Sequence, residues 1–310
     1  MKVADDDPNT RLSDEIISKR GARLARVCED TYQKLLKTDP NAVRPVYIVG
    51  SEVPIPGGAQ EASAGVQVTK VADFKATVSA FEKAFENEGL QETWNDVIGV
   101  VVQPGVEEAD TGPKEYDREE AKELMASIKD YPNLVFEGHS TDYQTKYALK
   151  ELVEDGVGIL KVGPGLTFAM REALFALAHI EEEVFHSTDV KTSNFIEVLD
   201  QAMLANPKNW QKHYHGDDNK LYIARKYSFS DRCRYYMPEA SVQTAIHTLI
   251  SNLSSIDIPL SLISQYMPIQ YTKIREHRLE KKPEVMLKDR IVNCIDEYLF
   301  ASHQDELFKD

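Results

Sequence analysis

Residues 97–105 read VIGVVVQPG, an apolar run that stops at a Gln-Pro-Gly turn. A strand that is apolar along its whole length is typical of a parallel sheet covered on both faces. Three further segments have the same form, at 46–49, 134–136 and 158–162, and each also ends in polar or glycine-rich residues. The pattern therefore predicts four strands of one parallel sheet.

Apolar residues at helical spacing separate these runs. They predict helices at 13–39, 73–88, 119–128, 147–155 and 167–185. Strands that alternate with amphipathic helices are typical of βα units, so the sequence predicts an α/β fold. In such folds the functional residues lie at the carboxyl ends of the strands.

The C-terminal part, 186–310, has a different composition, with frequent Tyr, His and Trp and mainly helical patterns. We expect two domains, with 1–185 forming the sheet and its helices and 186–310 forming a helical extension. A (β/α)₈ barrel needs eight strands, whereas only four are predicted here. Either the sheet is open or the chain lacks the first half of a barrel.

Composition excludes several classes of function. A formal charge of −15 argues against nucleic acid and against an anionic membrane surface. No segment has the length and hydropathy of a membrane span, and the first residues have no apolar signal core. The cysteines, Cys28, Cys233 and Cys294, match no zinc or disulfide spacing. We expect a cytoplasmic protein, and one anionic sugar phosphate remains compatible with this charge.

Carboxylates and an imidazole follow two of the predicted strands. Glu52 stands at the first strand end, where a solvated loop residue is the alternative to a functional one. The segment EGHSTDY (137–143) brings His139 together with Glu137 and Asp142. This clustering predicts an acid/base site or a metal site, with a structural histidine as the alternative. A divalent metal such as zinc would have to be held across strands, by Glu52 and His139.

Lys161 lies in the fourth strand, and alternation can direct it to the interior. A Schiff-base lysine is one hypothesis, and a lysine with a structural role is the other. After it, GPGLT (163–167) leads directly into a helix, so the N–H groups of Gly163, Gly165 and Thr167 would suit a phosphate. A plain turn is the alternative there.

Two arginines in the segment SDRCRYY (230–236), Arg232 and Arg234, could clamp the same phosphate. A structural Arg–Asp bridge is the alternative for them. Strand-end residues of a barrel project toward one mouth. We therefore expect Glu52, Gln103, His139, Asp142 and the 163–167 loop to converge.

Six strings in this chain resemble one family over nearly its whole length. They are VGSEVPIPGG (49–58), VVVQPGVE (100–107), EGHSTDYQT (137–145), LKVGPGLTFAMREALFALA (160–178), SFSDRCRYYMP (228–238) and IDIPLSLISQYMP (256–268). This ordered set resembles the Z-type subunits of class II D-tagatose-1,6-bisphosphate aldolase, the GatZ/KbaZ family.

The resemblance implies an aldolase-type (β/α)₈ barrel and an accessory role. Such Z-type subunits are non-catalytic and support the activity and stability of a zinc-dependent Y-type catalytic subunit. The pair cleaves tagatose 1,6-bisphosphate in galactitol and N-acetylgalactosamine catabolism. Metal-dependent C4-epimerisation of ketohexoses or their phosphates, such as tagatose and fructose, is the alternative that some relatives imply. A kinase has no support, because no Gly-x-x-x-x-Gly-Lys-[Ser/Thr] loop occurs.

The resemblance also implies where the four strands belong. Relatives have four more βα units, including an Asp-His-Leu-Gly-Pro motif, before the part that this chain matches. The four predicted strands then correspond to strands five to eight, and the sequence is expected to be shortened at its N-terminus. A metal site that uses the histidine of that motif would be incomplete here.

Overall fold

Packing divides the chain into two units. The computed structural model describes residues 3, 6, 12–50, 66–110 and 112–304. The first unit comprises Met1–Pro56, Ala62–Glu107 and Pro113–Val162, and the second comprises Gly57–Glu61, Glu108–Gly112 and Gly163–Asp310. Each unit has its own core.

A four-stranded parallel sheet forms the centre of the first unit. Its strands lie in the order β1 (Tyr47–Val49), β2 (Val97–Val102), β5 (Val135–Gly138) and β6 (Val157–Leu160). Every neighbouring pair is parallel. All four predicted strands are confirmed, and so is the α/β class of the fold.

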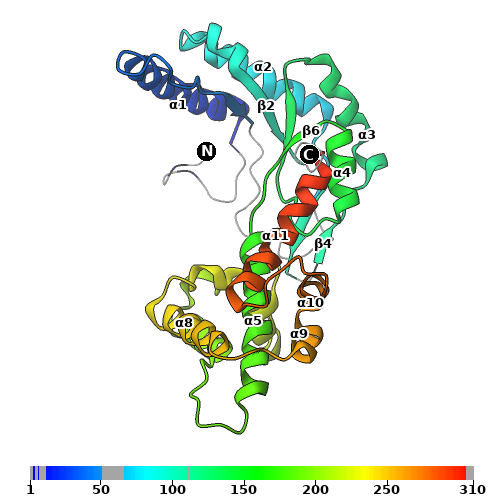
Figure 1. The fold of residues 1–310 in the computed structure, drawn as a ribbon. Helices are drawn as coiled ribbons and strands as arrows, with labels where there is room; N and C mark the ends of the chain where they lie inside the picture. The colour runs from blue at the N-terminus through cyan, green and yellow to red at the C-terminus, as the bar shows by residue number, and fades with distance from the viewer. Residues whose placement is uncertain (1–2, 4–5, 7–11, 51–65, 111, 305–310) are drawn as a thin grey trace. The chain divides into compact units, whose positions relative to one another are not determined.

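Helix α1 (Asp14–Leu35) precedes β1, and three helices connect the strands, namely α2 (Val71–Asn87), α3 (Arg118–Ser127) and α4 (Lys146–Glu154). Side-chain caps fix where three of these four helices begin. Ser13 accepts from the N–H of Ile16 at α1, Asp117 caps α3, and Thr145 caps α4. Figure 1 shows α1 beside α2, in agreement with their packing contact.

One face of the sheet is closed by apolar packing. Val100, Phe136 and Val157 are adjacent in the parallel register and have no exposed surface. Phe74 from α2 meets Phe136 edge to face, with ring centroids 5.1 Å apart. This contact attaches α2 to the middle of the sheet.

The opposite face retains exposed apolar side chains. Ile48 on β1 is 43% exposed and Val135 on β5 is 36% exposed. Between them lies Gly99, where an added Cβ would come within 3.2 Å of Ile159 Cδ1. The glycine lets the flanking side chains close over β2, but this face is not covered completely.

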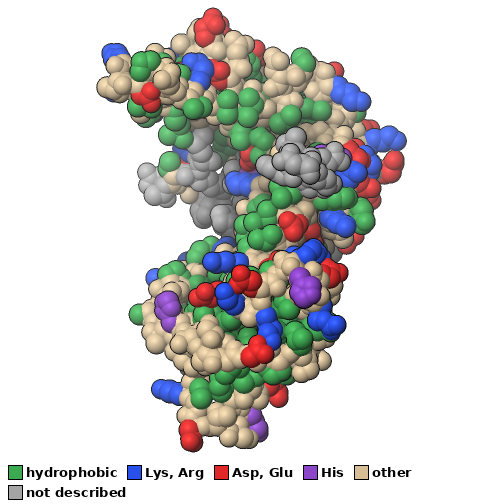
Figure 2. All heavy atoms as spheres, in the orientation of Figure 1, with side chains coloured by type: hydrophobic (Ala, Val, Ile, Leu, Met, Phe, Trp, Pro, Cys, Tyr) green, Lys and Arg blue, Asp and Glu red, His purple; other side chains and the backbone are tan. Residues whose placement is uncertain are grey.

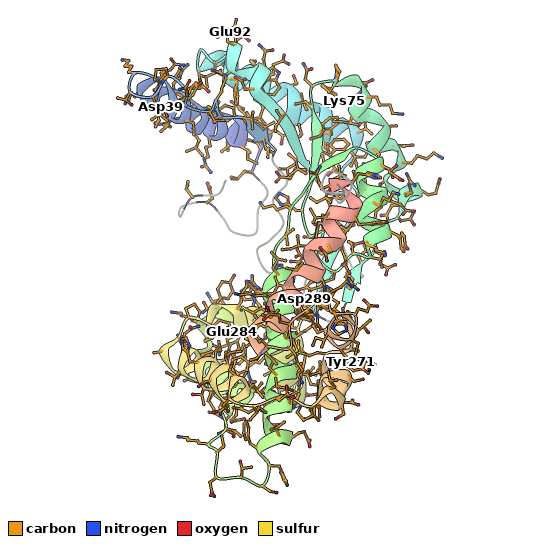
Figure 3. All side chains as sticks on the ribbon, viewed as in Figure 1. Asp39, Lys75, Glu92, Tyr271, Glu284 and Asp289 are labelled. Atoms are coloured by element: carbon orange, nitrogen blue, oxygen red, sulfur yellow. The ribbon has the colours of Figure 1, made fainter. Side chains whose placement is uncertain are left out.

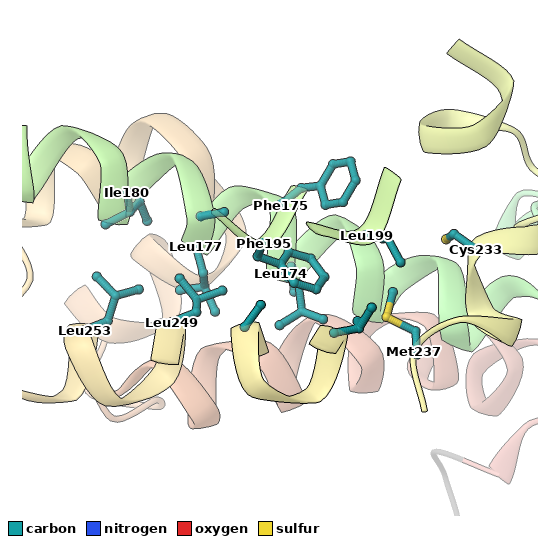
Figure 4. Packing of buried hydrophobic residues seen from close by; sticks show 14 of the residues in the cluster. Leu174, Phe175, Leu177, Ile180, Phe195, Leu199, Cys233, Met237, Leu249 and Leu253 are labelled. Atoms are coloured by element: carbon teal, nitrogen blue, oxygen red, sulfur yellow. The ribbon is translucent and has the colours of Figure 1, made fainter. Parts of the chain in front are cut away.

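The second unit is helical. Its α-helices are α5 (Gly165–Phe185), α6 (Phe195–Ala205), α7 (Asp218–Tyr227), α8 (Ala240–Ser254), α9 (Leu260–Tyr266), α10 (Pro268–Arg275) and α11 (Pro283–Ala301). The long helix α5 packs against α6, α8, α9 and α11. Figure 4 shows Leu174, Leu177 and Ile180 of α5 against Leu249 and Leu253 of α8.

Polar contacts join the last two helices. Asp289, which Figure 3 labels on α11, accepts from Lys273 Nζ at 2.8 Å and from Gln270 Nε2 at 2.9 Å. Both donors lie on α10. Gln270 is 2% exposed. The buried amide of Gln270 is therefore hydrogen-bonded.

The mainly helical character predicted for residues 186–310 is observed in the described part of that range.

Two local features differ from the sequence pattern. A short ribbon of β3 (Glu107–Ala109) and β4 (Gly112–Lys114) precedes α3 and carries no strand signal in the sequence. Helix α5 packs with the second unit, although the predicted domain boundary lies after residue 185. Packing units need not coincide with the limits of a barrel domain, so that boundary stays a prediction.

Charges of both signs are mixed on the surface. On the face shown in Figure 2, Lys and Arg side chains alternate with Asp and Glu side chains. The net charge of −15 is therefore not gathered into one field on this face.

Truncation of Phe136 tests the sheet core. Phe136→Ala removes a ring with no exposed surface and should lower the free energy of unfolding by about 3–5 kcal/mol. Tyr147→Ala on α4 is the matched control, since Tyr147 is 62% exposed, and it should cost less than about 0.5 kcal/mol. Urea unfolding followed by circular dichroism measures both, and equal losses would contradict this packing.

The uncovered face and the outer edge of β1 predict poor solubility of the 310-residue chain alone. Exposed apolar strands and unpaired edges promote association between chains. Ile48→Lys, which places a charge on β1, should reduce aggregation in light scattering. A monodisperse wild-type monomer with a sharp cooperative melt would contradict this prediction.

Candidate functional site

Three ionisable side chains meet at the carboxyl ends of β5 and β6. His139 Nε2 lies 2.7 Å from Glu137 Oε1 and 3.5 Å from Lys161 Nζ. The backbone holds them there, because the N–H of Lys161 donates to the carbonyl of Gly138 at 3.0 Å. The Thr141 hydroxyl also donates to the Lys161 carbonyl at 3.0 Å. We call these three side chains the strand-end cluster.

Burial sets the charge of the imidazole in this cluster. His139 is 8% exposed and Glu137 is 7% exposed. Burial lowers the pKa of His139, the hydrogen bond with Glu137 opposes this, and the charge of Lys161 lowers the pKa again. The ring is therefore neutral at pH 7.

A neutral ring cannot satisfy both of its neighbours through Nε2. The carboxylate of Glu137 only accepts a hydrogen bond and the ammonium of Lys161 only donates one. Nε2 either carries a hydrogen for Glu137 or offers a lone pair to Lys161. These two arrangements are the two tautomers of the neutral imidazole. Either tautomer has one ring nitrogen that can accept a proton, as a general base must.

The geometry does not suit a metal ion at this ring nitrogen. A cation bound at Nε2 would face the ammonium of Lys161, which lies 3.5 Å away. Within the described ranges no group of three or more His, Cys, Asp or Glu is arranged to hold a metal. Glu52, the other predicted ligand, lies outside the described residues. The shared metal therefore stays a prediction, and no chemistry is derived from it.

The structure shows the surroundings of two other residues expected at the mouth. Asp142 is 1% exposed, so its carboxylate is not presented to solvent. Gln103 turns its side-chain oxygen to its own loop, where it accepts from the N–H groups of Gly105 at 2.8 Å and Val106 at 3.0 Å. Gln103 thus shapes the turn after β2. Convergence with Glu52 and with the 163–167 loop stays a prediction.

The predicted phosphate loop begins α5 in the second unit. Pro164 is the N-cap and Gly165 is the first helical residue. The Thr167 hydroxyl lies 2.6 Å from Asp231 Oδ2 and 2.9 Å from the carbonyl of Pro164. One hydroxyl hydrogen can serve only one of these acceptors, and the shorter contact is with Asp231. A carboxylate therefore occupies the first turn of α5.

The two arginines predicted to clamp phosphate are engaged with backbone. Arg232 Nη1 donates to the carbonyl of Asn209 at 2.8 Å. Arg234 Nη1 donates to the carbonyl of Asp231 at 2.9 Å, and its guanidinium lies 4.5 Å above the ring of Tyr235. These contacts support the structural alternative for both side chains. Their role in phosphate binding stays a prediction.

Buried contacts hold the segment 228–236 against the rest of the second unit. The hydroxyls of Ser228 and Ser230 donate to Asp110 Oδ1 at 2.7 and 3.2 Å. Asp231 has φ +47°, in the left-handed region that non-glycine residues seldom adopt. Burial raises the pKa of Asp231, while hydrogen bonds from Thr167 and Cys233 oppose the shift.

One charged residue near α5 was not singled out from the sequence. Arg171 is 3% exposed and faces Asp231 from the second turn of the helix. The available signal was a charge that directly follows the apolar residues Phe168–Met170 and directly precedes Glu172. Helical patterns place such charges on solvated faces far more often than in cores.

Comparison with known proteins follows this geometry. A family model described as D-tagatose-1,6-bisphosphate aldolase subunit GatZ/KbaZ-like matches residues 1–303. The chain belongs to the GatZ/KbaZ-like family. Its membership confirms the resemblance seen in the six sequence strings and connects the chain with tagatose-bisphosphate aldolase and carbohydrate metabolism.

A solved structure has the same fold as this GatZ/KbaZ-like chain. It is the crystal structure of a probable tagatose 6 phosphate kinase from Sinorhizobium meliloti 1021, with 38% sequence identity and a TM-score of 0.83. The match covers 96% of this chain and 70% of that one. In this chain no described helix has the length and apolarity of a membrane span.

Charge changes in the strand-end cluster should shift the titration of His139 in opposite directions. Lys161→Met removes a cation and should raise the pKa of His139. Glu137→Gln removes a carboxylate and should lower it. A pH titration of the His139 ring signals by NMR measures both, with the signals of His179 as an internal reference. A shift in the same direction in both variants would contradict the observed contacts.

Proposed function

We propose that this chain is a non-catalytic subunit of a cytoplasmic tagatose-1,6-bisphosphate aldolase complex. It would support the activity and stability of a separate Y-type catalytic subunit. The observation that carries the proposal is the family match over residues 1–303, whose description is that of an aldolase subunit. The sugar phosphate would be handled by the complex as a whole.

We also propose that the parallel sheet is part of an aldolase-type (β/α)₈ barrel, as its strands five to eight. Parallel pairing of all four strands, with α2, α3 and α4 in the connections between them, supports this. The barrel would cover the face that carries Ile48 and Val135.

A metal-dependent C4-epimerase of ketohexoses or their phosphates is the second candidate. One observation favours it, namely the strand-end cluster of Glu137, His139 and Lys161. Epimerisation at C4 of a 2-ketose can proceed by cleavage and re-formation of the C3–C4 bond, in which the C4 hydroxyl loses a proton and later regains it. A buried neutral imidazole between a carboxylate and an ammonium can take up and return that proton. Glu52 would have to join this cluster for a metal to take part.

Reconstitution separates the two candidates. Tagatose 1,6-bisphosphate is supplied to the chain alone, to a Y-type subunit alone and to both together. The accessory role predicts that this chain alone cleaves nothing and that the mixture cleaves faster, or survives heating longer, than the Y-type subunit alone. Conversion between tagatose and fructose phosphates by this chain alone, lost on chelation, would instead establish the epimerase.

Substitution of the cluster sharpens this comparison. His139→Ala should leave the stimulation of the Y-type subunit within about twofold, because a supporting surface needs no imidazole. The epimerase predicts a loss of about 10²-fold or more in its turnover. Tyr147→Ala serves as the surface control in both assays. Loss of stimulation in His139→Ala with an unchanged melting temperature would count against a purely supporting role.

A further inference from the structure

Among the described residues of the second unit, two buried Arg–Asp pairs differ in how completely their hydrogen-bonding groups are satisfied. In the first, Arg225 donates to both oxygens of Asp200, from Nε at 2.7 Å and from Nη2 at 3.1 Å. In the second, Arg171 Nε lies 3.5 Å from Asp231 Oδ1. Both arginines are less than 10% exposed. Only the first pair has the bidentate geometry that compensates for burying the charges.

Arg171 therefore has an unused hydrogen-bonding capacity. Its Nε is buried and makes no hydrogen bond within the described part of the chain. A buried donor without an acceptor is costly, and such groups are rare in folded proteins. A bound ligand that accepted the hydrogen of Arg171 Nε would remove this cost.

Aromatic rings hold this guanidinium in place. Its carbon lies 4.2 Å from the ring centre of Phe168, 5.1 Å from that of Phe175 and 5.8 Å from that of Tyr227. Stacked rings fix the plane of the guanidinium but accept none of its hydrogens. The group is thus oriented in advance, while its donors keep their capacity for an anion.

Arg171 and the start of α5 point at the same carboxylate. Thr167 contacts Asp231 Oδ2, and Arg171, one turn further along the helix, faces Asp231 Oδ1. The N-terminal end of a helix also favours negative charge. The Thr167 hydroxyl, the Arg171 guanidinium and the N-terminal end of α5 therefore all lie near the carboxylate of Asp231.

We propose that this place binds a phosphate monoester, that Arg171 is its guanidinium, and that Asp231 is an internal anion which the phosphate displaces. If the proposed function holds, the phosphate group belongs to a sugar phosphate. The sugar assignment therefore rests on the proposed function. The anion site itself does not depend on it.

The carboxylate of Asp231 satisfies Arg171 incompletely, so a phosphate that makes closer contacts can displace it. It has two oxygens, and one of them reaches Arg171 only at 3.5 Å. Its backbone is in the left-handed region and its carboxylate is nearly buried, with 2% of the residue exposed. A phosphate monoester has three acceptor oxygens and up to two charges, so it can engage the hydroxyl and the guanidinium together.

The Nε of Arg232 is also buried without a hydrogen bond among the described residues, so Arg171 is distinguished from the neighbouring arginines by what their Nη groups contact. Arg232 and Arg234 donate to the backbone carbonyls of Asn209 and Asp231, respectively. Moving them to a ligand would leave those carbonyls without these donors. Arg171 gives up only a long contact with Asp231.

The test measures binding of inorganic phosphate to the full chain by isothermal titration calorimetry. Arg171→Gln should weaken binding by at least about tenfold, the loss expected for hydrogen bonds to a charged group. Asp231→Asn keeps an oxygen for Thr167 but removes the competing charge, and should tighten binding by about tenfold. Asp200→Asn is the matched control, and should lower the melting temperature without changing phosphate affinity.

Two results would overturn the site. One is the lack of saturable phosphate binding in both the wild type and Asp231→Asn. The other is equal affinity in the wild type and Arg171→Gln. If Arg171→Gln does not fold, Arg171→Lys decides, because it keeps the charge but loses the stacked, forked group. Affinity for phosphate as strong in Arg171→Lys as in the wild type then counts against the proposal.

A second titration identifies the source of the phosphate. Tagatose 6-phosphate, free tagatose and inorganic phosphate are compared on the wild type and on Arg171→Gln. Tighter binding of the sugar phosphate than of phosphate, lost in the variant, supports a sugar phosphate. Equal binding of the two anions restricts the proposal to a phosphate group and overturns the sugar assignment. Phosphate binding that persists while the reconstituted aldolase shows no stimulation refutes the proposed function and leaves the site intact.

Discussion

Parallel pairing of β5 with β6 is the constraint on which the strand-end cluster depends. The register places Glu137 opposite Ile159 and Gly138 opposite Leu160. Both strands then end at the same edge of the sheet, as parallel strands must. Lys161 and His139, 22 residues apart, are brought within 3.5 Å in this way. A helix between the strands, α4, is what permits this return.

The second unit depends on how α5 handles buried charge. The helix is apolar around most of its circumference, yet it also buries Glu181 and Arg171. Glu181 is satisfied, because its oxygens accept from the N–H of Ser193 at 2.9 Å and from Asn252 Nδ2 at 2.6 Å. Arg171 on the same helix is not satisfied to this degree. Hydrogen bonds within the unit satisfy Glu181, whereas Arg171 has aromatic contacts and one long ion pair, and its buried Nε makes no hydrogen bond among the described residues.

The fold was largely predictable because its signals are local. Continuous apolar runs identified all four strands, and Ser13 identified the start of α1. The β3–β4 ribbon was missed because its residues have no alternation or apolar run. Assignment of α5 to a packing unit depends on contacts with α8 and α11, more than 50 residues away in sequence, which no local pattern contains.

The candidate sites were predictable only in part. Position at a strand end drew attention to His139 and Lys161, whose side chains lie 3.5 Å apart in the structure, but spacing could not show that Glu137 is the hydrogen-bond partner. Gln103 has the same position and instead caps its own turn. Arg171 resembles a solvated helix charge in sequence, and its burial arises from Phe168, Phe175 and Tyr227 after folding.

Direct association with a catalytic aldolase subunit tests the central claim most directly. The chain and a Y-type subunit of tagatose-bisphosphate aldolase are analysed separately and together by sedimentation velocity. An accessory subunit predicts a faster boundary that contains both proteins at a fixed ratio. Two independent boundaries at concentrations well above those of the activity assay would contradict it.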